Sequence, residues 1–240
     1  NCKIKKNIGI IGDRVFAFAK GLDKDQAKLF EKSPDKRKGK WNKILTLKNS
    51  PSLNKYNFEF KDEKLTFTIK DKEILTININ QSNEREALSN KISELESSLK
   101  QPIVLMKNDA FPFFDTSISK KIDFVNSISL LNIQSINDFE KRTNKSIDAS
   151  IFRGNLCIDE IEPWKEREWI GEIIKINNVS FKVEKNIPRC VAINLKPKSD
   201  DNSFDLLQLL KKNYNHFDMG IYLRAMSDGK IETGNTIEVN

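Results

Sequence analysis

Histidine and cysteine are scarce in this chain of 240 residues. It contains one histidine, His216, and three cysteines, Cys2, Cys157 and Cys190, with no Cys-x-x-Cys spacing between them. A single imidazole leaves little room for histidine-based catalysis or for a multi-histidine metal site. Three cysteines in this arrangement argue against a disulfide framework, a zinc ribbon and an internal iron–sulfur cluster.

Long apolar runs are absent too. No segment is long enough to cross a membrane and the N-terminal residues show no signal-peptide pattern, so we expect a cytoplasmic protein with no membrane partner. Hydrophobic residues at 38% and charged residues at 31% are typical of a soluble globular protein. The formal net charge of +7 favours anionic partners, although a solvated lysine surface is the more ordinary explanation.

Hydrophobic periodicity predicts a mixed fold in which strands outnumber helices. The expected strands are 56–60, 65–69, 75–80, 103–106 and 128–131, together with a hairpin of 174–176 and 179–183 around Asn177-Asn178. The expected helices are 84–100, 133–143 and 204–214. Capping boxes are expected at Asn83 with Glu86 and at Ser135 with Asp138, and Ser203 as the cap of the last helix.

Two stretches are expected to be loops. Residues 32–40 are rich in charge and turn formers, which predicts a mobile, solvated segment. Residues 109–123 are the best candidate for a domain boundary. We therefore expect an α+β, predominantly β fold with two domains, a smaller β-rich one over 1–115 and a β-barrel core with peripheral helices over 116–240.

Cys190 is the most informative residue of the chain. It directly follows Pro188 and Arg189, in a short apolar run that ends in a proline turn. A cysteine beside fixed positive charge ionises more readily, and the thiolate is both a nucleophile and a soft metal ligand. A lone cysteine in an apolar strand is also often a small core residue, so both interpretations stay open here. Cys157 has only apolar neighbours and is interpreted as structural.

A second polar motif, Phe152-Arg-Gly-Asn155, lies upstream of Cys190. Arg153 can hold a phosphate through its planar fork, and Asn155 can offer an amide donor to the same ligand. An ordinary surface salt bridge explains Arg153 equally well. His216 is not assigned a catalytic role, and the glutamates at 160, 162, 166 and 168 are expected to form a solvated rim.

These motifs, in this order and spacing, resemble a known family. Phe152-Arg-Gly-Asn-Leu-Cys-Ile-Asp159, the segment from Trp164 to Gly171, Ile187-Pro-Arg-Cys190 and Asp218-Met-Gly-Ile-Tyr222 are similar to the MOSC domain over about residues 122–239. That domain is found in molybdenum-cofactor sulfurases and amidoxime-reducing proteins. Gly12-Asp-Arg14 and the strands after it resemble, less specifically, the β-barrel domain that precedes MOSC in many members.

The resemblance implies a molybdenum-cofactor site. Cys190 is then the thiolate ligand of the molybdenum of Mo-molybdopterin and the catalytic residue. The residues implied around the pterin and its phosphate are Arg153, Asn155, Arg189, Asn194, Asn132 and Ser135, with Thr46 and Lys48 from the N-terminal part. The sequence departs from the family at Gly154, where proline is common, and at Val191–Asn194, where relatives are threonine-rich. The family's opening strand with its basic residue would fall before Asn1.

The function implied is reduction of a small N-hydroxylated (N–O) substrate at Cys-ligated molybdenum. Since the chain carries no haem or iron–sulfur motif, a separate haem, flavin or iron–sulfur protein is expected to donate electrons. The alternative is a carrier, in which Cys190 holds sulfur as a persulfide or the domain stores the cofactor. Binding of nucleic acid by a basic β-barrel is disfavoured, because no stripe of aromatic and basic residues is evident.

Overall fold

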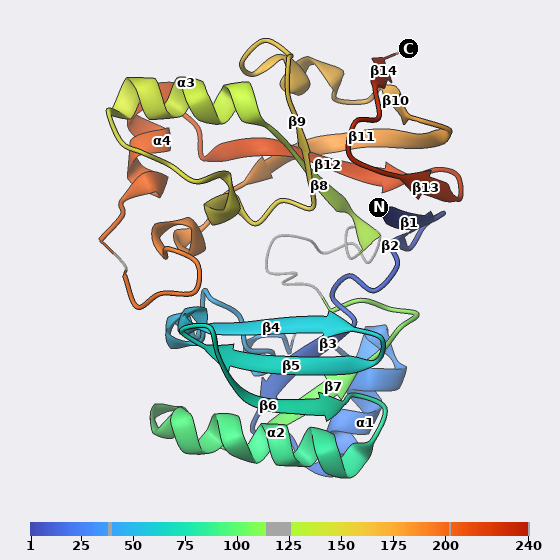
Figure 1. Ribbon diagram of the computed structural model, residues 1–240, viewed down its shortest axis with the longest axis vertical. Helices are drawn as coiled ribbons and strands as arrows, with labels where there is room; N and C mark the ends of the chain where they lie inside the picture. Colours follow the sequence, from blue (N-terminus) through green and yellow to red (C-terminus); the bar gives the residue numbers. More distant parts are fainter. Residues whose placement is uncertain (38–39, 114–125, 202, 240) are drawn as a thin grey trace. The chain divides into compact units, whose positions relative to one another are not determined.

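A computed structural model of the protein describes residues 1–37, 40–113, 126–201 and 203–239 (Figure 1). The chain forms two compact units, each built from separate stretches. The first unit comprises the described residues of 1–13, 126–195 and 202–240, and the second those of 14–125 and 196–201. The limits expected from the sequence, 1–115 and 116–240, stay a prediction, and most of the expected boundary at 109–123 lies outside the described residues.

The elements of the first unit are the strands β1 (Cys2–Lys5), β2 (Gly9–Ile10), β8 (Ile128–Asn132), β9 (Leu156–Ile158), β10 (Ile173–Ile176), β11 (Val179–Pro188), β12 (Asp218–Ala225), β13 (Gly229–Ile231) and β14 (Ile237–Val239), with the helices α3 (Ile133–Thr143) and α4 (Leu206–Tyr214). Those of the second unit are the strands β3 (Phe16–Lys20), β4 (Tyr56–Lys61), β5 (Lys64–Ile69), β6 (Lys72–Asn78) and β7 (Ile103–Lys107), with the helices α1 (Lys24–Lys32) and α2 (Ser82–Leu95). The expected α+β, predominantly β fold is confirmed, and none of the helices just named is long and apolar enough to cross a membrane.

A six-stranded sheet organises the first unit, in the order β14-β10-β11-β12-β8-β9. All neighbours are antiparallel except β8 and β9, and β1 joins β2 and β13 in a separate small sheet. The hairpin expected at Asn177-Asn178 joins β10 to β11, and Asn177 adopts the left-handed conformation that such a turn requires. Alternating side chains such as Ile174, Phe181 and Leu223 point into one apolar core.

Gly220 permits the close approach of β12 and β8. Its φ of +78° is left-handed, and an added Cβ would lie 2.3 Å from the carbonyl oxygen of Leu130. A side chain here would push the two central strands apart, because backbone cannot move aside as a flexible side chain can. This requirement explains the glycine of the Asp218–Tyr222 motif.

Helices α3 and α4 pack together on a second core of this unit (Figure 1). Ile136 and Phe139 of α3 and Leu206 and Leu210 of α4 are buried at helical spacing. The expected range 133–143 of α3 is confirmed. Its cap is Asn132, whose side chain accepts from the Gln134 amide, so the box expected at Ser135 and Asp138 is wrong.

The second unit pairs a three-stranded meander, β4-β5-β6, with a two-stranded sheet of β3 and β7. Leu65, Phe67 and Ile77 of the meander pack against Leu88 and Ile92 of α2 in a common core. The strand patterns read from the sequence in this region are confirmed. The helix α1 was not expected, although Asp23 and Gln26 form a full capping box at its start.

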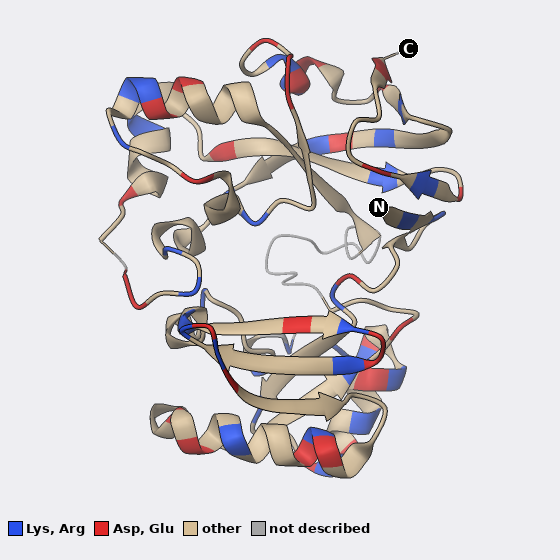
Figure 2. Ribbon diagram, viewed as in Figure 1, with Lys and Arg blue, Asp and Glu red and all other residues tan. Residues whose placement is uncertain are grey.

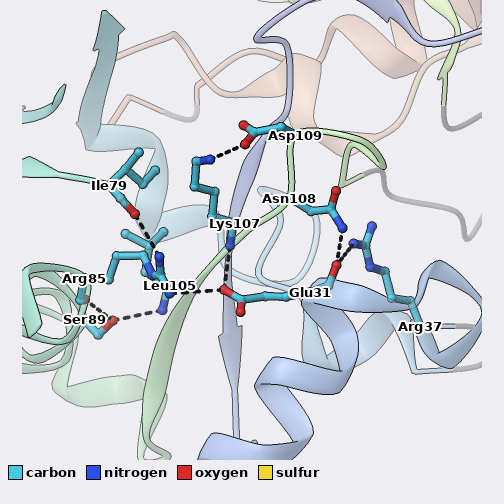
Figure 3. A network of polar contacts seen from close by, with 9 residues as sticks. All are labelled: Glu31, Arg37, Ile79, Arg85, Ser89, Leu105, Lys107, Asn108 and Asp109. Atoms are coloured by element: carbon cyan, nitrogen blue, oxygen red, sulfur yellow. Dashed lines mark hydrogen bonds and ion pairs between the residues drawn. The ribbon is translucent and has the colours of Figure 1, made fainter. Parts of the chain in front are cut away.

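Side chains of α1 and α2 close the free edge of β7 (Figure 3). The amide of Leu105 donates to Ser89 Oγ at 2.9 Å, and that of Lys107 donates to Glu31 Oε1 at 2.9 Å. Arg85 approaches the same Glu31 carboxylate at 3.7 Å and donates to the carbonyl of Ile79. Two edge amides are thus satisfied without another strand, which removes a site for strand addition.

Two expectations for this unit are wrong in detail. The helix expected over 84–100 ends at Leu95, because Glu96 turns inward and accepts from Tyr56 Oη at 2.5 Å and Ser52 Oγ at 2.7 Å. The cap expected at Asn83 is absent, and Gln81 precedes the first turn. Within the charged stretch 32–40, Arg37 is buried and donates to the carbonyls of Phe30 and Pro112, so this part is not a solvated loop.

Candidate functional site at Cys190

Cys190 lies where β11 ends and a short 3-10 helix, Val191–Asn194, begins. Its thiol is free and partly exposed. The preceding residue continues the pairing with β12, since the Arg189 amide donates to the Phe217 carbonyl at 2.8 Å. The Cys190 carbonyl in turn accepts from the Ile193 amide at 3.1 Å. The thiol is therefore held at a fixed strand-to-helix corner and is not sealed in the core.

Arg153 braces the turn that follows Cys190. Its guanidinium donates to the carbonyls of Ala192 at 2.9 Å and Leu195 at 3.2 Å, and to that of Ile151 at 2.8 Å. Arg153 itself is left-handed at φ +50°, at the end of the 3-10 helix Ala149–Phe152. At Gly154, an added Cβ would lie 2.5 Å from Leu131 side-chain atoms, so the chain passes where only glycine fits without a shift.

Arg189 braces the strand that precedes Cys190. Nε donates to the Met219 carbonyl at 2.9 Å, Nη2 donates to the same oxygen, and Nη1 donates to the Phe152 carbonyl at 2.8 Å. The guanidinium also lies 5.6 Å from the centroid of the Phe152 ring. Burial lowers the pKa of Arg189 to about 10, which leaves it charged at neutral pH.

The guanidinium groups of Arg153 and Arg189 interact electrostatically with Cys190. Burial is the largest influence on the pKa of Arg153 and of Arg189 and lowers both, while the negative charge of ionised Cys190 raises both. Repulsion from Arg153 lowers the pKa of Arg189 further. Two cations near one thiolate are the surroundings expected of a reactive or metal-binding cysteine.

Asn155 and Asn194 hold secondary structure at either side of this corner. Asn155 Oδ1 accepts from the amide of Ser129 at 2.9 Å and from its hydroxyl at 2.8 Å, which fixes the entry to β9 beside β8. Asn194 Oδ1 accepts from the Leu207 amide at 3.1 Å, so it performs the capping of α4 that was expected of Ser203. Their role at a cofactor stays a prediction.

Asn132 and Ser135 surround a carboxylate of the protein. Glu166 is fully buried, and its carboxylate accepts from Asn132 Nδ2 at 2.9 Å and from Ser135 Oγ at 3.0 Å. Burial raises the pKa of Glu166, and the hydrogen bonds from Asn132 and Ser135 only partly oppose this. The expectation of a solvated glutamate rim is therefore wrong at position 166. No local pattern signals this burial, because the partners lie about thirty residues away in sequence.

Thr46 and Lys48 belong to the second unit. Thr46 lines a cavity of about 240 Å³ whose walls include Phe16, Phe58 and Phe113, and Lys48 is exposed. Their share in the site of the first unit remains a prediction. In the described ranges, no group of three or more His, Cys, Asp or Glu side chains is arranged to hold a metal.

The comparison with known protein families concerns the C-terminal half of the chain. The family model of the MOSC domain matches residues 123–238, which confirms over this region the resemblance drawn from the sequence. Among solved structures, YiiM from Geobacillus stearothermophilus matches at 17% identity and a TM-score of 0.37, over 47% of this chain and 53% of its own. The match thus spans about half of that protein, and a likeness of this size supports no shared activity. A search of the curated proteins found no match.

The residues near Cys190 suit the metal of a molybdenum cofactor better than its phosphate. A cysteine thiolate is a soft ligand suited to such a centre, and Cys190 lies at a partly exposed corner within electrostatic reach of Arg153 and Arg189. The guanidinium donors that bond to carbonyls are committed to the fold, so Arg153 and Arg189 would act on an anionic cofactor mainly by charge. Asn132 and Ser135 fit a phosphate less well, because Glu166 already occupies them.

Proposed function

We propose that the chain binds the molybdenum cofactor through Cys190 and reduces small N-hydroxylated compounds. The observation that carries the proposal is the free, partly exposed thiol of Cys190, placed in the region that matches the MOSC domain and within electrostatic reach of Arg153 and Arg189. When bound, the cofactor would supply the oxygen-atom and electron-transfer chemistry, which no side chain of this chain provides.

The chain's own residues would position the Cys190 ligand and neutralise the negative charge of the cofactor. Cys190 contributes a thiolate, and the bonds of Arg153 to Ala192 and Leu195 hold the turn that presents it. Arg189 fixes the preceding backbone and keeps a second positive charge near the sulfur. Both cations would attract a phosphate-bearing ligand. Electrons would come from a separate redox protein, and a cytoplasmic location remains a prediction.

The test compares cysteine variants purified from cells that make the cofactor. Wild-type protein and Cys157→Ser should contain molybdenum and reduce an amidoxime with dithionite-reduced methyl viologen as donor, whereas Cys190→Ser should retain much less molybdenum and lose the reductase activity. Cys157 is a matched control because it lies in the same unit. Equal molybdenum content in all three would remove Cys190 as ligand. Molybdenum or an added sulfur on Cys190 without reductase activity would instead identify a carrier.

A further inference from the structure

Basic residues lie in the last turns of α3 and α4, two helices that pack together (Figure 2). Lys141 and Arg142 lie in the last turn of α3, and Lys211 and Lys212 lie in the last turn of α4. All four are exposed. Cations at helix C-termini are favoured by the helix dipole, but two such ends side by side also create a local positive surface.

Tyr214 joins the two helix ends. Its hydroxyl donates to Asp138 Oδ2 at 2.8 Å, and its ring lies 5.0 Å from the guanidinium carbon of Arg142. Arg142 Nε donates to the same carboxylate oxygen at 3.0 Å. Burial raises the pKa of Asp138, but the hydrogen bonds from Trp164, Tyr214 and Arg142 outweigh it and lower the pKa. These contacts hold Tyr214 and Arg142 in place, while Asp138 offsets the charge of Arg142, so the three lysines supply the net positive charge.

Partly exposed aromatic rings adjoin the basic end of α4. The Trp164 ring centroid lies 4.4 Å from that of Tyr214 and 5.6 Å from that of His216. Phe217 is 37% exposed, with Lys211 Nζ 5.6 Å from its ring centroid. Aromatic residues and arginine at the centre, with charged residues around them, are the composition of a protein-binding hot spot.

The aromatic group adjoins the corner that carries Cys190. The Phe217 carbonyl accepts the amide of Arg189 at 2.8 Å, and Asp218 pairs with Pro188 across the two strands. His216 is thus in the segment that runs antiparallel beside Arg189 and Cys190. A protein that covers the aromatic rings would come close to the thiol corner without any contribution from the second unit.

We propose that the ends of α3 and α4, with Trp164, Tyr214, His216 and Phe217, form the docking surface for an acidic electron-donor protein. The role as electron donor rests on the function proposed above, whereas the docking itself follows from charge and aromatic exposure. Reduction of an N-hydroxylated base to the base and water consumes two electrons and two protons. The donor protein is oxidised in this exchange, and the solvent supplies the protons.

The experiment uses an acidic [2Fe–2S] ferredoxin as the probe and the full chain loaded with cofactor. The patch variant is Lys141→Glu with Lys212→Glu. Both lysines are exposed, one in the last turn of each helix. The control, Lys28→Glu with Lys72→Glu, makes the same charge change at exposed positions of the second unit. Calorimetric titration measures binding of ferredoxin and, separately, of a single-stranded oligonucleotide, and turnover is measured with ferredoxin and with reduced methyl viologen.

The proposal predicts at least about tenfold weaker ferredoxin binding for the patch variant, with less than about twofold change for the control. Ferredoxin binding should also weaken steeply with salt. The proposal would be overturned if the wild type did not bind ferredoxin, or if the patch and control variants lost the same amount of ferredoxin affinity. It would also be overturned if the patch variant lost more affinity for the single-stranded oligonucleotide than for ferredoxin. Absence of turnover with methyl viologen, with ferredoxin binding intact, would instead refute the proposed reductase function.

Discussion

Cys190 and Cys157 lie in the same unit but in contrasting surroundings. Cys190 sits at a strand-to-helix corner within the electrostatic reach of Arg153 and Arg189. Cys157 lies inside β9 between Leu156 and Ile158. It is the more exposed residue of the two, but desolvation of its sulfur by these apolar neighbours raises the pKa of its thiol. Both thiols are free, so the comparison teaches how nearby fixed charge, rather than pairing in a disulfide, can distinguish two cysteines of one unit.

Arg189→Met is expected to have the largest effect on the difference in reactivity between Cys190 and Cys157. The variant removes hydrogen bonds to the carbonyls of Met219 and Phe152 and should lower the free energy of unfolding by about 3 kcal/mol. It also removes one cation beside Cys190, so alkylation of Cys190 by iodoacetamide at pH 7 should slow toward the rate of Cys157. Urea unfolding and mass-spectrometric alkylation rates measure the two effects. An unchanged Cys190 rate would contradict the electrostatic account.

Glu166→Ala should destabilise the first unit without changing the ratio of the Cys190 and Cys157 alkylation rates. It leaves Asn132 Nδ2 and Ser135 Oγ buried without their carboxylate, at a cost of about 2 kcal/mol. The ratio of the two alkylation rates should stay as in the wild type, which makes this variant the control for general destabilisation. A fall in the ratio like that of Arg189→Met would show that stability, and not charge, controls the thiols.

The same carboxylate predicts a pH dependence. Because its folded pKa is raised above the unfolded value, Glu166 binds its proton more tightly in the folded state. Its contribution therefore makes the protein less stable as pH rises through the folded pKa, and Glu166→Gln should flatten that decline. Unfolding free energies of both proteins between pH 4 and 8 check the sign. A steeper decline in the variant would contradict it.

In the wild type, Cys190 should react faster with iodoacetamide at pH 7 than Cys157, by on the order of tenfold. The pKa of the Cys157 thiol is raised by burial, which leaves little thiolate at neutral pH. Residue-resolved alkylation rates of the Cys2→Ser variant give the ratio directly. Equal rates would remove the contrast.

The smallest expected effect belongs to Arg153→Gln. The glutamine can keep one hydrogen bond to the turn after Cys190 but loses the charge, so we expect about 1 kcal/mol of lost stability. Alkylation of Cys190 should slow less than in Arg189→Met, because Arg189 remains. Thermal unfolding and alkylation rates test both points, and a larger effect than that of Arg189→Met would reverse the assigned order.

Local patterns made much of this fold predictable. Alternation over 65–69 and the helical spacing in 133–143 depend on neighbours in the sequence, and both elements are present as expected. The ends of elements were missed where a distant partner decides them. Leu95 ends α2 because Glu96 bonds to Tyr56 and Ser52, and no spacing reveals that contact.

In the candidate site, too, features that depend on local sequence could be predicted, and features that depend on distant partners could not. Cys190 and its arginines could be proposed from a contiguous motif and from a family resemblance. Their bracing role could not, because the guanidinium partners are main-chain carbonyls, which carry no side-chain signature. The burial of Glu166 was missed for a similar reason: its charge predicts exposure, and only Asn132 and Ser135 together make burial tolerable.

X-ray absorption at the molybdenum edge tests the central claim most directly. The cofactor-loaded wild type and Cys157→Ser should show one more sulfur neighbour of the metal than Cys190→Ser, in which only the dithiolene sulfurs remain. The same number of sulfur neighbours in all three loaded proteins would contradict the assignment of Cys190 as the molybdenum ligand.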